Sequence, residues 1–218
     1  MVKQKSLVAI FDVDGTLIDS GRKLKMDVVN AFAGLGKIIS PEEVSGDWYR
    51  LAEQYGFSKE QFDEAFNHRK SWQQSLYDGE CPLFNDTIPC LDALKQRGIR
   101  LAALSKSIPE YTFDKIDFHK LRRYFDDIET VHPREKDKVR GALDLTSRLD
   151  PETIEKAYFI GDTPGDVTIA RDVKKKYSLS TEGIYVCRTT KPANLPAECN
   201  LVNSLNSIPE IIRRQNGK

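Results

Sequence analysis

The chain has 218 residues, 39% of them hydrophobic, and its 33 basic residues balance its 33 acidic residues. A chain of this length can bury a core either as one domain with an insertion or as two small domains. Because the formal net charge is zero, no overall field favours a nucleic-acid polymer or an anionic membrane as a partner.

The apolar runs and the cysteines bear on the compartment. No apolar stretch approaches the ~20 residues that cross a bilayer, and the hydrophobic run near the start is too short for a signal peptide. The four cysteines have neither CxxC spacing nor the density of a disulfide scaffold. We therefore expect a cytoplasmic protein that does not bind a membrane and has reduced cysteines.

The first predicted element is a strand at residues 7–11, LVAIF, which is apolar throughout and so expected to be buried on both faces. Asp12 and Asp14 follow at its carboxyl end, and Gly15 and Thr16 come next. A calcium loop does not fit, because the residues after Gly15 do not continue the alternation of oxygen ligands. The acidic pair is therefore a candidate functional site.

The next region has no convincing strand. Helical spacing occurs in three segments, at residues 21–35, 41–55 and 58–77. The second opens with Ser40-Pro41-Glu42-Glu43 and the third with Ser58-Lys59-Glu60-Gln61, both of which have the residue types of a helix N-terminus. We expect residues 18–85 to form a small helical domain inserted after the first strand.

Beyond residue 85, strand-like runs alternate with helical segments. The strands are predicted at 99–105, 127–131, 157–162, 183–187 and 200–203, and the helices include 86–97 and 136–149. This alternation predicts an α/β fold with a parallel, doubly wound, Rossmann-like sheet. Residues 1–17 and 86–218 are the expected core domain.

Polar side chains follow three of the predicted strands directly. They are Asp12 and Asp14, Ser105 and Lys106, and Asp162 with Asp166. Ligands of open parallel sheets collect at these strand ends. Several carboxylates gathered there would repel one another unless a divalent cation joined them, and oxygen ligands of this kind suit Mg²⁺.

These motifs resemble the haloacid dehalogenase superfamily, and in particular its phosphoglycolate phosphatase-like phosphatases. The likeness rests on DxDGT after one strand, a serine at the end of the second, a lysine further on and GDxxxD after a later strand. It covers residues 5–17 and 86–210. The helical insertion is similar to the cap that the family places between its first and second motifs.

The resemblance implies a role for each residue of the first motif. Asp12 would be the nucleophile that forms an aspartyl-phosphate, and Asp14 would be the general acid and then the base. Gly15 would permit the tight turn, while Thr16 and Ser105 would donate hydrogen bonds to phosphoryl oxygens.

The resemblance also implies a metal site. Mg²⁺ would be held by the Asp12 carboxylate, the Asp14 backbone carbonyl and Asp162, with Asp166 supporting through its own carboxylate.

The motif lysine would neutralise charge on the phosphoryl group. Ungapped comparison with the family's helix start selects Lys136, but the expected prolines are absent and Lys138 stays open. Lys106 stands where the family often has asparagine, so it could add positive charge for a substrate with a second anionic group.

The expected function is a Mg²⁺-dependent phosphatase acting on a small phosphorylated metabolite, such as a phosphoglycolate-like compound, a sugar phosphate or a nucleotide. One alternative is a phosphomutase of the same superfamily, and another is a binding protein that has lost catalysis. A glycosyltransferase that uses a DxD pair fits less well, because GDxxxD and the ordered lysine have no place in it. The leaving group of the substrate is not fixed by these motifs.

Overall fold

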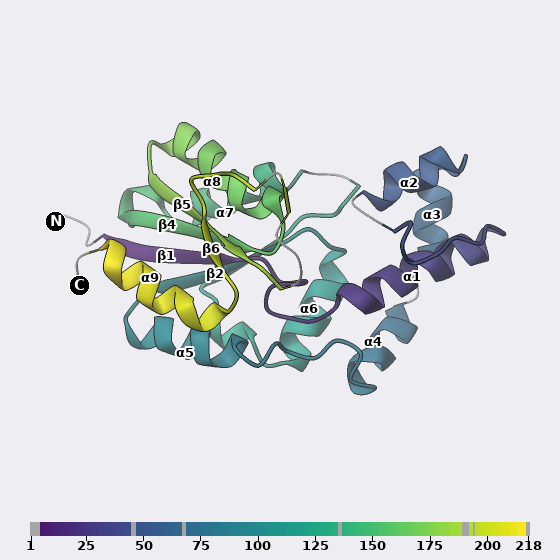
Figure 1. Cartoon of the computed structure of the whole chain (residues 1–218), viewed down its shortest axis with the longest axis horizontal. Helices are drawn as coiled ribbons and strands as arrows, with labels where there is room; N and C mark the ends of the chain where they lie inside the picture. The colour runs from purple at the N-terminus through teal and green to yellow at the C-terminus, as the bar shows by residue number, and fades with distance from the viewer. Residues whose placement is uncertain are drawn as a thin grey trace. The chain divides into compact units, whose positions relative to one another are not determined.

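A computed structural model of the chain describes residues 5–44, 47–66, 69–134, 137–188, 192–193 and 195–216 (Figure 1). The chain divides into two compact units. An α/β unit contains Met1–Ile18 and Leu83–Lys218, and a helical unit contains Asp19–Pro82. The sequence predicted the helical part at residues 18–85.

Six strands of the described chain form one sheet in the α/β unit. They are β1 (Ser6–Phe11), β2 (Arg100–Ser105), β3 (Asp127–Thr130), β4 (Ile154–Gly161), β5 (Ser180–Val186) and β6 (Asn200–Val202). Their order is β3-β2-β1-β4-β5-β6, and every neighbouring pair is parallel. The predicted parallel α/β sheet is confirmed. β4 and β5 each begin three residues earlier than the sequence indicated.

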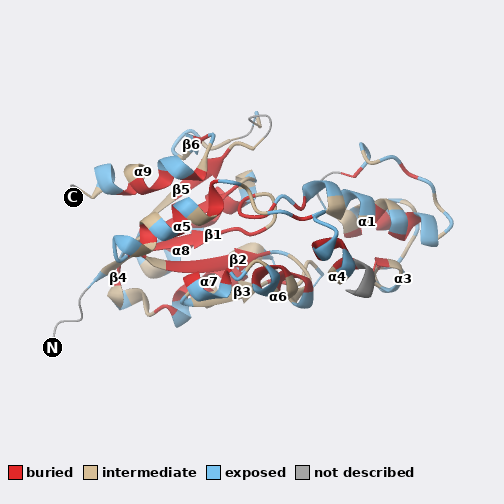
Figure 2. Ribbon diagram, turned by 90° about the horizontal axis from the view of Figure 1, so that it is seen from below, coloured by how far each residue is buried: buried red, intermediate tan, exposed pale blue. Residues whose placement is uncertain are grey.

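The centre of the sheet is the most apolar part of the unit. In β1 the four residues from Val8 to Phe11 are almost fully buried, as the red central strands of Figure 2 show. Phe11 pairs with Ala103 of β2 on one side and with Ile160 of β4 on the other. The carboxyl ends of these three strands therefore lie at the same edge of the sheet, and the chain passes from one side of β1 to the other between β3 and β4.

Helices cover both faces of this sheet. They are α5 (Thr87–Gln96), α6 (Pro109–Phe118), α7 (Lys138–Arg148), α8 (Pro164–Tyr177) and α9 (Ile208–Gln215). Figure 1 shows α7 and α8 on one face and α5 and α9 on the other. Short 3₁₀ turns at Arg122–Tyr124, Pro151–Thr153 and Leu205–Ser207 complete the unit. Across the described ranges, no helix combines the length and apolar content needed to cross a bilayer.

The helical unit contains α1 (Gly21–Gly34), α2 (Trp48–Gln54), α3 (Lys59–Phe66) and α4 (Arg69–Tyr77). The predicted helix at 41–55 is wrong in its first half: residues 41–43 form a turn, and α2 begins at Trp48. The reason is the side chain of Asp47, which accepts hydrogen bonds from the amides of Tyr49 and Arg50 and so caps the helix there.

The predicted segment 58–77 is described as α3 and α4, which flank residues 67–68, outside the described part of the chain. Its predicted N-cap is confirmed, because the Gln61 amide donates to Ser58 Oγ at 3.2 Å and the Ser58 amide donates to Gln61 at 2.8 Å. Aromatic rings pack between the helices: the Phe62 ring lies 5.5 Å from those of Phe32 and Tyr49, centroid to centroid. These contacts form the core of the helical unit.

Candidate active site

Asp12 lies at the centre of the carboxyl edge of the sheet. Its amide donates to the Ile160 carbonyl at 2.8 Å, which continues the pairing of β1 with β4 by one residue. Its side chain therefore lies just beyond the last residue of β1, at the carboxyl edge of the sheet, and is only 8% exposed. The end of a buried strand thus places a carboxylate where an open parallel sheet binds ligands.

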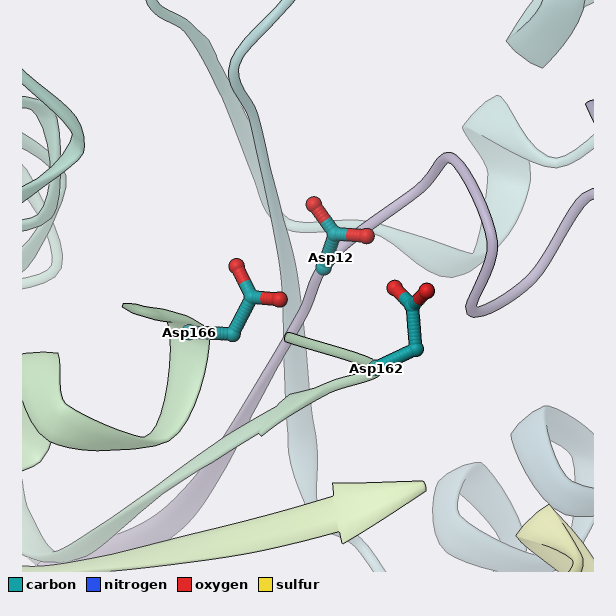
Figure 3. A group of neighbouring side chains, drawn as sticks. All are labelled: Asp12, Asp162 and Asp166. Carbon is teal, nitrogen blue, oxygen red and sulfur yellow. The ribbon is translucent and has the colours of Figure 1, made fainter. Parts of the chain in front are cut away.

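Two further carboxylates converge on Asp12. Asp162 follows β4, and Asp166 lies in the first turn of α8. Figure 3 shows the three side chains as neighbours with their carboxylates extended to the same side, and one oxygen from each lies within 4.8 Å of the others. Three oxygen ligands at this separation fit a divalent cation such as Mg²⁺.

Asp166 is fixed by a capping box at the start of α8. Its Oδ2 accepts from the Thr163 amide at 3.0 Å and from the Thr163 hydroxyl at 2.6 Å, while the Asp166 amide donates to Thr163 Oγ1. Gly161 lets the helix start come this close, because a Cβ at that position would collide with the Asp166 side chain. The oxygen that remains, Oδ1, faces the site.

Burial and mutual repulsion make the ionised forms of Asp12 and Asp162 less favourable. Burial raises the pKa of Asp12 well above its usual value, against the attraction of Lys138, and the charges of Asp166 and Asp162 raise it further. Burial, followed by the charge of Asp166, raises the pKa of Asp162 to about 6. The cluster therefore needs positive charge beside it, which agrees with the donor set of a cation site.

Lys138 supplies part of this positive charge. Its Nζ donates to Oδ1 of both Asp12 and Asp166. Burial lowers its pKa, but the charges of these two carboxylates outweigh burial and raise the pKa above its usual value. Asp137 caps α7 by accepting from the Arg140 amide at 2.7 Å, so that Lys138 begins the helix. Lys136, the lysine that the sequence favoured, lies outside the described residues.

Gly15 and Thr16 form the turn that follows the acidic pair. Gly15 has a φ of 81°, and a Cβ there would collide with the Asp162 carboxylate, so both its conformation and its close approach require glycine. Thr16 is fully buried, and its hydroxyl contacts Asp12 Oδ2 at 3.1 Å and Asp162 Oδ1 at 3.0 Å. In this structure the Thr16 hydroxyl therefore orients the two carboxylates.

Ser105 and Lys106 end the neighbouring strand differently. Ser105 is buried at the last position of β2 and accepts a hydrogen bond from Thr112 Oγ1 at 3.3 Å. Lys106 is exposed, and within the described part of the chain no hydrogen bond or ion pair joins it to the other site residues. Ser105 thus belongs to the buried edge and Lys106 to its surface.

The sequence did not single out Lys115. It comes from α6, its side chain is fully buried, and its Nζ donates to Asp14 Oδ1. A signal was present: Tyr111, Thr112 and Ile116 mark the buried side of the helix, and Lys115 occupies a position on that side where an apolar residue is expected.

The sequence also missed a pair formed by Arg188 and Asp86. Arg188 follows β5, and its two terminal nitrogens each donate to one oxygen of Asp86 at 2.9 Å. One of them also donates to the Thr16 carbonyl at 2.6 Å. This ion pair therefore stabilises the position of the turn that contains Thr16. Arg188 stands at a strand end, which is the signal that identified Asp12 and Ser105.

Comparisons with known proteins identify the family of the chain. The family model described as haloacid dehalogenase-like hydrolase matches residues 7–174. A protein of Caldanaerobacter subterraneus subsp. tengcongensis, provisionally named pyrophosphatase PpaX, is 30% identical over 77% of this chain and 78% of its own length. The phosphoglycolate phosphatase of Aquifex aeolicus is 29% identical over 81% of this chain and 85% of its own.

A solved structure gives the same fold. The crystal structure of a predicted phosphatase from Clostridium acetobutylicum has a TM-score of 0.77 and 19% identity, with 97% of this chain and 100% of that chain covered. The order of the motifs along the sheet, the family model and the relatives agree. The chain is therefore an enzyme that belongs to the haloacid dehalogenase-like hydrolases.

Proposed function

We propose that this chain is a Mg²⁺-dependent phosphatase that hydrolyses a small phosphate monoester through a phosphorylated Asp12. The observation that carries the proposal is the meeting of Asp12, Asp162, Asp166 and Lys138 at the carboxyl edge of the sheet. The names of the relatives, a phosphoglycolate phosphatase and a pyrophosphatase, support chemistry at phosphorus.

Mg²⁺ would be held by the carboxylates of Asp12 and Asp162 and by the backbone carbonyl of Asp14, with Asp166 in support. The three converging carboxylates and the raised pKa values of Asp12 and Asp162 fit such an ion. When bound, Mg²⁺ supplies positive charge that offsets the charge on phosphoryl oxygens.

The chain's own residues divide the reaction into two displacements. The Asp12 carboxylate attacks phosphorus, the bond to the leaving oxygen breaks, and Asp14 gives a proton to that oxygen. Water then attacks the phosphorus of the aspartyl-phosphate and returns a proton to Asp14, so that Asp12 and inorganic phosphate are released. Asp12 and Asp14 end as they began, which closes the cycle.

Lys138 is our assignment for the motif lysine, because it contacts the nucleophile directly. Its ammonium group balances charge on Asp12 and on the phosphoryl group during transfer. Ser105, buried at the carboxyl end of the strand next to β1, is assigned to a hydrogen bond with a phosphoryl oxygen. Thr16 keeps Asp12 and Asp162 in orientation.

Phosphate release from a panel of compounds tests the proposal. The panel contains phosphoglycolate, pyrophosphate, sugar phosphates and nucleotides, each with Mg²⁺ or with chelator, for the wild type and for Asp12→Asn. Release is expected only with Mg²⁺ and only from the wild type. The matched control is Asp127→Asn, since Asp127 pairs with Arg148 at the start of β3, far along the strand from the site.

Two outcomes would contradict the proposal. Normal turnover by a folded Asp12→Asn would remove Asp12 as the nucleophile. Isomerised sugar phosphate in place of free phosphate would identify a phosphomutase instead.

A further inference from the structure

Helix α6 turns a polar, buried side toward the site. Thr112 and Lys115 are three positions apart, so they lie on the same side of the helix. Thr112 donates to Ser105 at 3.3 Å, and Lys115 donates to Asp14. One helix side thus contacts two residues to which the proposed function gives separate roles.

The burial of Lys115 is unusual for its residue type. Lysine normally keeps its charged end in water, but this side chain is fully buried while that of Asp14 is 16% exposed. Replacing a buried ion pair with apolar groups is often neutral or stabilising, so stability alone gives no reason for a lysine here.

The backbone around Asp14 is already fixed without Lys115. The Gly15 amide donates to the Ile18 carbonyl at 2.8 Å, and Asp14 and Ile18 form a β-bridge across the turn. The Asp14 side chain is held as well, because its Oδ1 accepts a hydrogen bond from the ammonium group of Lys115. Asp14 is not among the three carboxylates that meet within 4.8 Å, which are those of Asp12, Asp162 and Asp166.

We propose that Lys115 is a positioning residue that orients Asp14 for proton transfer, with Oδ1 held by the lysine and Oδ2 directed at the leaving oxygen. This inference rests on the proposed phosphatase function. When the bond from phosphorus to the leaving oxygen breaks, its electron pair stays on that oxygen, which takes the proton from Asp14 Oδ2. Lys115 keeps its own protons and acts only through Asp14.

The test compares two esters that depend differently on an acid. An alkyl phosphate leaves as a poorly stabilised alkoxide and needs the proton, whereas p-nitrophenyl phosphate leaves as a stabilised phenolate and does not. For Lys115→Met we expect kcat/KM to fall about 10-fold or more for the alkyl ester and at most about 3-fold for the aryl ester. This difference is what partial loss of a general acid produces, because only the alkyl ester needs the proton.

Three variants provide the references. Asp14→Asn is expected to show the same selectivity with a larger loss, and adding Lys115→Met to it should cost little more, because the two residues act as a unit. Lys115→Arg keeps the charge and should recover part of the alkyl-ester activity. Lys156→Met is the matched control: Lys156 pairs with Glu182 and belongs to β4 far from Asp162, so both esters should react as in the wild type.

Equal losses for both esters in a folded Lys115→Met, or full additivity with Asp14→Asn, would overturn the inference. Should Lys115→Met not fold, Lys115→Gln gives the same contrast with a polar side chain, and equal losses there would overturn it as well. Failure of the proposed function is distinct, since the wild type would then release no phosphate from either ester.

Discussion

The α/β unit and the helical unit bury different kinds of side chain. Among the residues whose burial is described, the α/β unit buries four charged side chains: Asp12, Asp86, Lys115 and Asp166. The helical unit buries the polar but uncharged Ser20 and Ser75. The helical unit is held by aromatic rings around Phe32 and Phe62. Burying charge is costly unless it is paired, and each of these charges has a partner: Lys138 for Asp12 and Asp166, Asp14 for Lys115, and Arg188 for Asp86.

The largest effect is expected in the helical unit, where Phe62→Ala should remove the centre of the aromatic core. Phe62 is 1% exposed, and its truncation should lower the free energy of unfolding by about 4 kcal/mol. Both tryptophans, Trp48 and Trp72, lie in this unit, so urea unfolding followed by tryptophan fluorescence reports on it directly.

Ile38→Ala is the control, because Ile38 is 91% exposed and its loss should change stability by less than about 0.5 kcal/mol. Similar losses for Phe62→Ala and Ile38→Ala would show that the aromatic cluster does not hold the helical unit together.

In the α/β unit, Lys138→Met should lower kcat about 10²- to 10³-fold, as expected for removing one charge aligned with the reacting group. Steady-state phosphate release measures it, and circular dichroism checks the fold. Lys136→Met tests the alternative and is expected to lose far less. A larger loss for Lys136→Met would assign the motif lysine to that position.

A smaller effect is expected at the pair that holds the Thr16 turn. Asp86→Asn should lower the free energy of unfolding by about 2 kcal/mol near neutral pH, because it leaves the Arg188 charge unbalanced. Asp117→Asn, which breaks an exposed pair with Arg122, should cost much less.

The Asp86 pair also predicts a pH dependence. Burial works to raise the pKa of Asp86, but hydrogen bonds from Arg188, Ser204 and Leu205 outweigh it and hold the pKa below the usual 3.8. The stabilisation is therefore complete above the unfolded-state value and is lost as the pH falls through the lower folded-state value. Urea unfolding should show the wild-type advantage over Asp86→Asn shrinking below that pH; an advantage that is constant down to the acid limit would contradict it.

One sequence pattern, an apolar run followed directly by a polar residue, explains what could be predicted from the sequence. Apolar runs that end in Asp12, Ser105 and Asp162 mark both the strands and the edge where they meet, so the sheet and its carboxylates followed from local patterns. The start of α2 did not, because a single side-chain cap at Asp47 determined it.

Local patterns mark the positions of Lys115 and Arg188, but they do not show which distant residues these two side chains contact. Lys115 contacts a residue 101 positions away, and Arg188 contacts one 102 positions away. A lysine in a helix usually points to solvent, and an aspartate before a helix usually caps it, so no local pattern indicates the partners that Lys115 and Asp86 have. Asp86 makes no side-chain cap and pairs with Arg188 instead.

The capping box of α8 has a consequence for observation in solution. One oxygen of Asp166 binds Lys138 while the other binds the backbone amide of Thr163, so a single carboxylate joins the site to that amide. A change of charge at this end of the sheet therefore alters the polarisation of the Thr163 N–H bond, because the Asp166 side chain connects the two. In an amide NMR spectrum, the resonance of Thr163 would therefore serve as a built-in reporter of site occupancy, readable without any chemical turnover.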